Sequence, residues 1–156
     1  MSIERGDALP TSALVAADGS ALALPAWGGG APFVLYFYPK DDTSGCTREA
    51  QDFTALMPEF TALGVQVLGI SKDPPAKHQK FTAKYDLAVP LATDEDGALM
   101  EALGVWVEKS MYGKKYMGIE RSTFLFDSSA KLVRAWRKVK VPGHAAAVLD
   151  AARALG

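Results

Sequence analysis

The only cysteine of this 156-residue chain, Cys46, stands at a position suited to chemistry. An apolar run from Phe33 to Tyr38 precedes it, and polar, turn-forming residues separate the two. This order places the thiol where a strand passes into a helix. At the first turn of a helix, free backbone N–H groups and the positive end of the helix dipole favour thiolate over thiol. Cys46 is therefore a candidate nucleophile. The polar neighbours argue against the alternative, a buried cysteine acting as a small hydrophobic side chain.

Pro39 and Thr43 form a short pattern with Cys46: a proline, a hydroxyl residue four positions later, and a cysteine three positions after that. This pattern resembles the active-site motif of peroxiredoxins. Alone it would be weak, but further matches follow in the right order from about Phe33 to the C-terminus, and together they are similar to the PrxQ or bacterioferritin comigratory protein branch. These matches are Tyr36 to Asp41, Gly45 to Thr47, Glu49-Ala50, Met111 to Lys114, Gly118 to Phe124, Trp136 to Val141, and Gly143-His144.

The resemblance implies a role for each of five residues. Cys46 would attack the peroxide, and Arg121 matches the catalytic arginine whose donors hold the thiolate and the peroxide together. Glu49 matches the glutamate that orients this arginine. The hydroxyl of Thr43 would contact the peroxide while charge moves between its two oxygen atoms, and Pro39 would exclude water from one side.

Each role has an ordinary structural alternative. Thr43 is also a suitable helix N-cap, and this role is compatible with catalysis. Arg121 without the resemblance is a surface charge paired with its neighbour Glu120. Pro39 alone indicates only that a strand ends there.

The two histidines, His78 and His144, are separated in the sequence and are expected to be structural or exposed. A thiolate nucleophile needs no base, so neither is expected to be catalytic. One cysteine and two scattered histidines do not make a metal-binding pattern. We therefore expect no metal and no cofactor.

The sequence departs from the PrxQ branch that it resembles, because it lacks a second cysteine. Many members carry a resolving cysteine five residues after the reactive one or on the following helix, and these positions are Gln51 and Thr82 here. An intrachain disulfide is excluded because the chain has a single cysteine. Oxidation must therefore stop at a sulfenic acid or form a bond to another molecule. Thioredoxin, glutaredoxin and glutathione are all open as the external reductant.

These observations give a leading hypothesis and an alternative. The first is a thiol peroxidase that reduces hydrogen peroxide and organic hydroperoxides through a Cys46 sulfenic acid. The second is a redox sensor or adaptor that forms mixed disulfides through Cys46. A disulfide reductase is weakly supported, because the chain has no Cys-x-x-Cys pair.

Length and charge agree with one domain over residues 1–156 that binds neither nucleic acid nor membrane. The chain carries 17 basic and 18 acidic side chains. Its basic cluster alternates with apolar residues and is interpreted as a solvated strand face; it comprises Arg134, Arg137, Lys138 and Lys140. The N-terminus does not resemble a signal peptide, and no stretch of about 18 apolar residues occurs. We expect a cytoplasmic protein, a monomer or at most a weak dimer.

The elements that must position these residues alternate between strand and helix. The predicted elements are a hairpin over 13–24, a strand over 33–38, a helix after Cys46, a strand over 65–71, a helix from Pro74-Pro75, a strand over 90–93, a helix over 97–103, a hairpin made of 122–126 and 131–139, and a last helix after Pro142-Gly143. The segment rich in Gly, Lys and Met that precedes Ser122 is predicted to be a loop. This order predicts an α/β, thioredoxin-like fold: a central mixed sheet flanked by helices, with an N-terminal β-hairpin.

Overall fold

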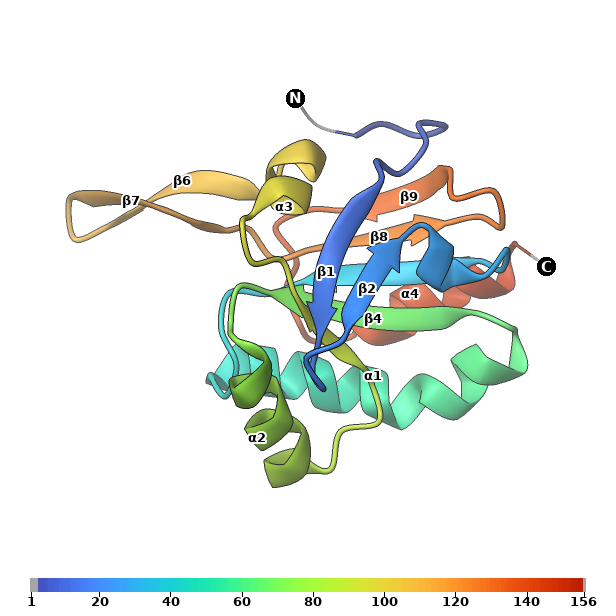
Figure 1. Cartoon of the computed structure of the whole chain (residues 1–156), viewed down its shortest axis with the longest axis horizontal. Coiled ribbons are helices and arrows are strands. Elements are labelled where there is room, and N and C mark those ends of the chain that lie inside the picture. Colours follow the sequence, from blue (N-terminus) through green and yellow to red (C-terminus); the bar gives the residue numbers. More distant parts are fainter. Residues whose placement is uncertain (1–2, 156) are drawn as a thin grey trace.

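The computed structural model describes residues 3–155, and its main feature is one mixed sheet (Figure 1). The three central strands run parallel to one another, and the outer strands are antiparallel to their neighbours. Across the sheet the order is β2 (Ala21–Leu24), β1 (Ser12–Ala16), β5 (Leu91–Thr93), β4 (Gln66–Ser71), β3 (Phe33–Phe37), β8 (Ser122–Phe126) and β9 (Leu132–Trp136). The predicted mixed sheet with an N-terminal hairpin is confirmed.

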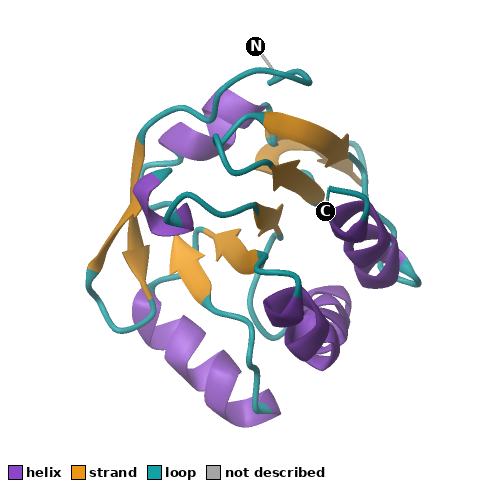
Figure 2. Ribbon diagram, turned by 90° about the vertical axis from the view of Figure 1, so that its right-hand side faces the viewer, coloured by secondary structure: helices purple, strands orange, loops and turns teal. Residues whose placement is uncertain are grey.

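Helices cover both faces of this sheet (Figures 1 and 2). They are α1 (Ser44–Ala62), α2 (Pro75–Tyr85), α3 (Ala98–Leu103) and α4 (His144–Arg153), with a short 3-10 helix at Ala26–Gly28. The apolar sides of α1, α2 and α4 pack on one face, and α3 packs on the other. Within residues 3–155, no helix combines the length and the apolar content that crossing a membrane requires.

Strand β3 forms the centre of the core. Its side chains point alternately to the two faces of the sheet. All five residues are buried, because both faces are covered. Phe33, Leu35 and Phe37 lie in the α3-side core, whereas Val34 and Tyr36 lie beneath α1 and α4. Fully burying each such apolar side chain contributes about 1.5–3 kcal/mol, so the strand that leads to Cys46 is firmly anchored.

A further hairpin stands where the sequence predicted a loop, and this part of the prediction is wrong. Strands β6 (Trp106–Met111) and β7 (Lys114–Ile119) pair antiparallel and project from the body of the molecule (Figure 1). Tyr112 and Gly113 form the two-residue turn, with φ values of 51° and 79°. Positive φ at both positions is the geometry of a tight hairpin turn. We call residues 106–119 the arm.

The basic residues near β9 are not one solvated strand face. The strand ends at Trp136, so within the cluster only Arg134 lies on it. Arg137 is partly buried and donates to the carbonyl oxygens of Leu103 at 2.9 Å and Gly104 at 3.4 Å. This side chain therefore ties the segment after β9 to the end of α3.

The topology brings Cys46 and Arg121, which are 75 positions apart in the sequence, to one place. Strand β3 runs towards the loop that precedes Cys46, and β8 pairs antiparallel with β3, so that Phe37 lies opposite Ser122. Arg121 immediately precedes β8. Its backbone therefore lies beside the end of β3, close to the start of α1.

Candidate active site

Cys46 is the third residue of α1, and its side chain is buried, with 2% of the residue exposed. Thr43 precedes the helix in an extended conformation and occupies the N-cap position. Its hydroxyl donates to the carbonyl oxygen of Lys40 at 2.8 Å instead of capping the helix. No side chain among the described residues caps this first turn. The N-terminal end of α1 therefore keeps its positive potential at the sulfur.

The guanidinium of Arg121 joins Cys46 to Glu49. One terminal nitrogen, Nη2, donates to Cys46 Sγ at 3.2 Å, and the other, Nη1, donates to Glu49 Oε1 at 2.6 Å. Cys46 and Glu49 are three residues apart on α1 and so share one face of the helix. The planar fork of the arginine is suited to this double contact, because it donates from two separate nitrogens, whereas a lysine has only one.

A glycine allows this close approach. A Cβ atom on Gly45 would lie 3.2 Å from Arg121 Nη2, closer than ordinary van der Waals contact. A larger residue at position 45 would therefore push the guanidinium away from the sulfur. This role of Gly45 was not predicted, although the residue lies within the motif that resembles that of peroxiredoxins.

Glu49 is almost completely buried, with 1% exposed. Burial raises its pKa from an ordinary value of 4.5 to about 7, although the charge and hydrogen bond of Arg121 act in the opposite direction. Its second oxygen, Oε2, has no hydrogen-bond partner within residues 3–155. Near neutral pH the carboxyl is therefore divided between its charged and neutral forms.

Tyr36 lies beneath this cluster. Its hydroxyl is buried and, like Glu49 Oε2, lacks a partner within the described part of the chain. Burial, then the neighbouring Glu49 and Cys46, raise the pKa of Tyr36 well above its ordinary value. The ring stacks on Phe53 with centroids 4.6 Å apart and lies against Gly69, where a Cβ would come within 2.7 Å of the hydroxyl oxygen.

The loop before Cys46 is held by a buried polar network. Asp41 accepts from the Tyr38 hydroxyl at 2.6 Å and lies 2.7 Å from Nδ1 of His78, a residue of α2. The other ring nitrogen, Nε2, lies 3.1 Å from the carbonyl oxygen of Ala92. His78 is completely buried. Of the two positions expected for the histidines, structural or exposed, it takes the structural one.

A second link joins the same loop to α2 at the surface. Asp42 has a φ of 59° and accepts from Lys84 Nζ at 2.8 Å and from the Tyr85 hydroxyl at 2.6 Å. These two hydrogen bonds lower the pKa of Asp42. The loop that sets the start of α1 is therefore clamped to α2 by both of its aspartates, and no sequence pattern predicted this link.

The other predicted residues take varied positions. Pro39 is exposed in this structure, so the geometry gives no support to its expected role in excluding water. The alternative pairing of Arg121 with Glu120 is wrong, because Arg121 pairs with Glu49. Of the two positions that match a resolving cysteine, Gln51 is exposed on α1 and Thr82 is partly buried on α2.

His144 is buried at the start of α4, with Nε2 2.8 Å from the Thr123 hydroxyl. Burial, together with the positive charge of Arg121, lowers its pKa to about 4. The imidazole is therefore neutral at physiological pH. His144 ties α4 to β8 at Thr123, two residues after Arg121. Its position is therefore structural.

Comparison with known proteins agrees with this geometry. Residues 5–135 match the AhpC/TSA family. The chain is 55% identical over 121 residues to peroxiredoxin Bcp of Xanthomonas campestris, which covers 78% of this chain and 76% of the relative. A structure of the bacterioferritin comigratory protein of X. campestris matches with a TM-score of 0.86 and 49% identity, over 92% of this chain and 90% of the other.

A PrxQ mutant from Xylella fastidiosa matches over 99% of this chain and 98% of its own, with a TM-score of 0.92 and 39% identity. These neighbours confirm the predicted thioredoxin-like α/β fold. The residues that surround Cys46 also lie inside the region matched by the family. The chain therefore belongs to the AhpC/TSA family, and within it to the Bcp/PrxQ peroxiredoxins.

Proposed function

We propose that this peroxiredoxin reduces hydrogen peroxide and organic hydroperoxides with Cys46 as its only redox-active group. The contact between Arg121 Nη2 and Cys46 Sγ carries this proposal, because it places a permanent positive charge 3.2 Å from the sulfur. The bacterioferritin comigratory protein of X. campestris has alkyl peroxide reduction activity. This activity of a relative supports organic hydroperoxides as a substrate class.

The first step is a displacement at oxygen. The Cys46 thiolate supplies an electron pair to the terminal oxygen of R–O–O–H, the O–O bond breaks, and an alkoxide or hydroxide leaves. Sulfur is oxidised to Cys46–S–OH, and the peroxide becomes ROH once a proton completes the leaving group. Arg121 stabilises negative charge on sulfur before the reaction and on oxygen during it.

Neighbouring residues support this step. Glu49 accepts from Nη1 of Arg121 and so fixes the direction in which Nη2 points. The Thr43 hydroxyl, now bonded to Lys40, lies one turn before Cys46 and would turn towards a bound peroxide. Pro39 belongs to the same loop. We propose that it adds to water exclusion only when substrate or a partner covers this exposed side.

Recycling needs thiols from outside the chain. One thiol condenses with Cys46–S–OH to give a mixed disulfide and water, and a second thiol attacks that disulfide to release free Cys46. Thioredoxin, glutaredoxin and glutathione each supply this chemistry. No second cysteine competes, so excess peroxide should convert the sulfenic acid to sulfinic acid.

Steady-state consumption of cumene hydroperoxide with dithiothreitol as reductant tests the proposal. Sustained turnover that is lost in Cys46→Ser supports a peroxidase. Dimedone should label the unaltered protein after one equivalent of peroxide, because it reacts with sulfenic acids. Consumption of a single equivalent per chain, with no further turnover, would instead favour the redox sensor, and no reaction at Cys46 would refute both functions.

A further inference from the structure

The arm carries an unusual share of exposed apolar side chains. Within residues 3–155, five large hydrophobic residues are exposed, and four of them lie on the arm: Met111, Tyr112, Tyr116 and Met117. Tyr112, at the turn, is 97% exposed. A projecting hairpin makes few contacts with its own core, so these side chains do not stabilise the fold by burial. Clustered exposed apolar groups of this kind mark interaction surfaces.

The strand register separates the two faces of the arm. Lys109 lies opposite Tyr116, and Met111 lies opposite Lys114, so these four side chains share one face. Glu108 and Lys115 belong to the other face, where their charged groups lie 3.6 Å apart. The first face therefore combines two large apolar side chains with two lysines and no acidic residue. We call it the docking face.

A glycine shapes the docking face. A Cβ on Gly118 would lie 3.2 Å from Cδ of Lys109 and 3.3 Å from Cε2 of Tyr116. The lysine stem and the tyrosine ring therefore lie across the bare backbone of Gly118. This contact gives both side chains a surface to lie on, and any ordering that it provides lowers the entropy that a partner must remove on binding.

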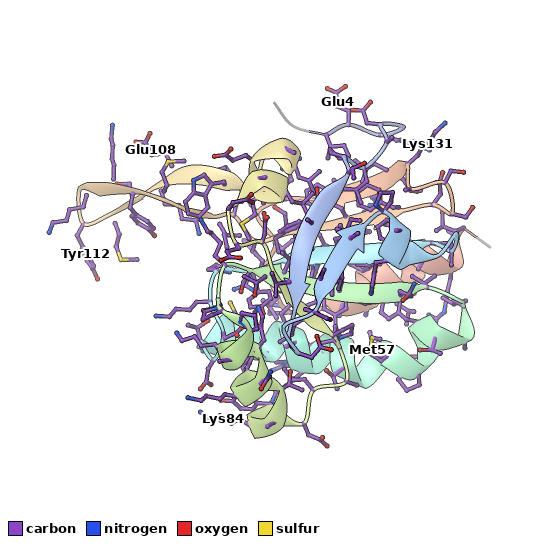
Figure 3. All side chains as sticks on the ribbon, viewed as in Figure 1. Glu4, Met57, Lys84, Glu108, Tyr112 and Lys131 are labelled. Carbon is purple, nitrogen blue, oxygen red and sulfur yellow. The ribbon has the colours of Figure 1, made fainter. Side chains whose placement is uncertain are left out.

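The arm also leads directly into the active site. β7 ends at Ile119, and Arg121 follows two residues later. At about 3.3 Å per strand residue, the tip lies roughly 20 Å from this end. Figure 3 shows Glu108 on the upper side of the arm, with α1 and α2 below it, so the docking face turns towards the side on which α1 begins. A 100-residue domain, with a radius of gyration of about 13 Å, is wide enough to span the arm from its tip to this end.

We propose that the docking face binds the protein that reduces oxidised Cys46: a dithiol protein with an acidic rim around its reactive cysteine. This inference rests on the proposed function. The lysines of the docking face select the acidic rim, and Met111 and Tyr116 supply the apolar contact. A bulky reductant needs such a surface, because Cys46 itself is buried and offers almost nothing to bind.

Two reductants test the proposal in the same peroxide assay. Thioredoxin, with thioredoxin reductase and NADPH, needs the docking face, whereas dithiothreitol is too small to use it. Tyr116→Ser and Lys109→Glu should each raise the KM for thioredoxin about ten-fold, as expected for a central interface residue. The dithiothreitol-dependent rate should stay unchanged. Added salt should raise the KM of the unaltered protein and have less effect on Lys109→Glu.

Matched controls lie away from the arm. Leu63→Ser removes the fifth exposed hydrophobic residue, and Lys131→Glu reverses a surface charge; neither should change the KM for thioredoxin. The proposal is overturned if the arm variants keep the normal KM, if they lose activity equally with dithiothreitol, or if thioredoxin supports no turnover above dithiothreitol. Sedimentation showing a dimer that Tyr116→Ser dissociates would assign the face to a second copy instead. Failure with dithiothreitol itself would refute the proposed function rather than the docking face.

Discussion

The buried carboxyl of Glu49 makes the stability of this protein depend on pH in a calculable way. Its pKa rises from 4.5 to about 7 on folding, so between these values the native state binds more protons than the unfolded state. The stability contributed by the neutral carboxyl is complete below pH 4.5 and is lost as the pH rises through 7. At about 1.36 kcal/mol per pKa unit, the loss is roughly 2–3 kcal/mol between pH 5 and pH 8.

Glu49→Gln removes this titration, and the amide oxygen of glutamine can still accept from Arg121. Both proteins should carry Cys46→Ser, so that no thiol ionises or is oxidised during the measurement. Urea unfolding at the two pH values gives the free energy of unfolding of each protein. From pH 5 to pH 8, the difference in free energy of unfolding between Glu49→Gln and its parent should shift by roughly 2–3 kcal/mol in favour of the variant.

A control on the same helix isolates the effect of burial. Glu59 is exposed and pairs with Arg153, so Glu59→Gln should show no comparable shift between the two pH values. If the shift for Glu49→Gln were smaller than about 0.5 kcal/mol, within the usual scatter of such differences, Glu49 would titrate normally. The assignment of burial as the dominant influence would then be refuted.

Three further predictions concern the same region. Arg121→Lys should lower kcat/KM for peroxide on the order of 100-fold, because one point charge cannot replace the fork; unchanged kinetics in the folded variant would make Arg121 structural. Thr82→Cys should form a disulfide with Cys46 after peroxide treatment, once local unfolding of α2 brings the Cα atoms within roughly 4.4–6.8 Å; mass spectrometry detects the bond, and its absence in a variant that still reacts with peroxide would mean that position 82 is not the resolving position. Tyr36→Phe removes an unpaired buried hydroxyl and should raise the free energy of unfolding by about 1 kcal/mol; a decrease in urea unfolding would show that the hydroxyl has a bound partner.

Strong apolar patterns made most of the fold predictable. Strand β3 is a continuous apolar run, and Phe53 and Phe60 recur on one face of α1, so the sequence indicates both elements directly. The arm gives no such signal. Only its base, at Trp106 and Ile119, packs on the core. Beyond the base both faces are largely exposed, so the arm lacks the alternation of apolar and polar residues that marks a half-buried strand. Its turn, Tyr112-Gly113, was the only local indication.

The site could be predicted only in part. The positions of Cys46 and Thr43 at the start of a helix were predicted from the residues around them. Arg121 and Glu49 were identified only through the resemblance to peroxiredoxins. The structure places Arg121 against both Cys46 and Glu49, and their catalytic roles stay predictions. The link between Asp41 and His78 joins residues 37 positions apart. No local pattern marks a buried polar pair of this kind, because each partner alone is typical of the surface.

The fork of Arg121 has a consequence for where a proton moves. In the proposed mechanism the Cys46 thiolate becomes a neutral sulfenic acid, so the cluster would lose one negative charge and the field of Arg121 would then act on Glu49 alone. Glu49, whose pKa is about 7, should then release the proton it holds, at the moment when the departing alkoxide requires one.

Proton uptake from solution should reveal this coupling. Near pH 7 in a weakly buffered solution, the reaction with one equivalent of peroxide should take up fewer protons per chain from the solution than the same reaction of Glu49→Gln. An indicator dye measures the difference, and equal uptake by the two proteins would show that Glu49 keeps its proton. Lower uptake by the protein with Glu49 would make this carboxyl, one turn along the helix from Cys46, the local source of the proton.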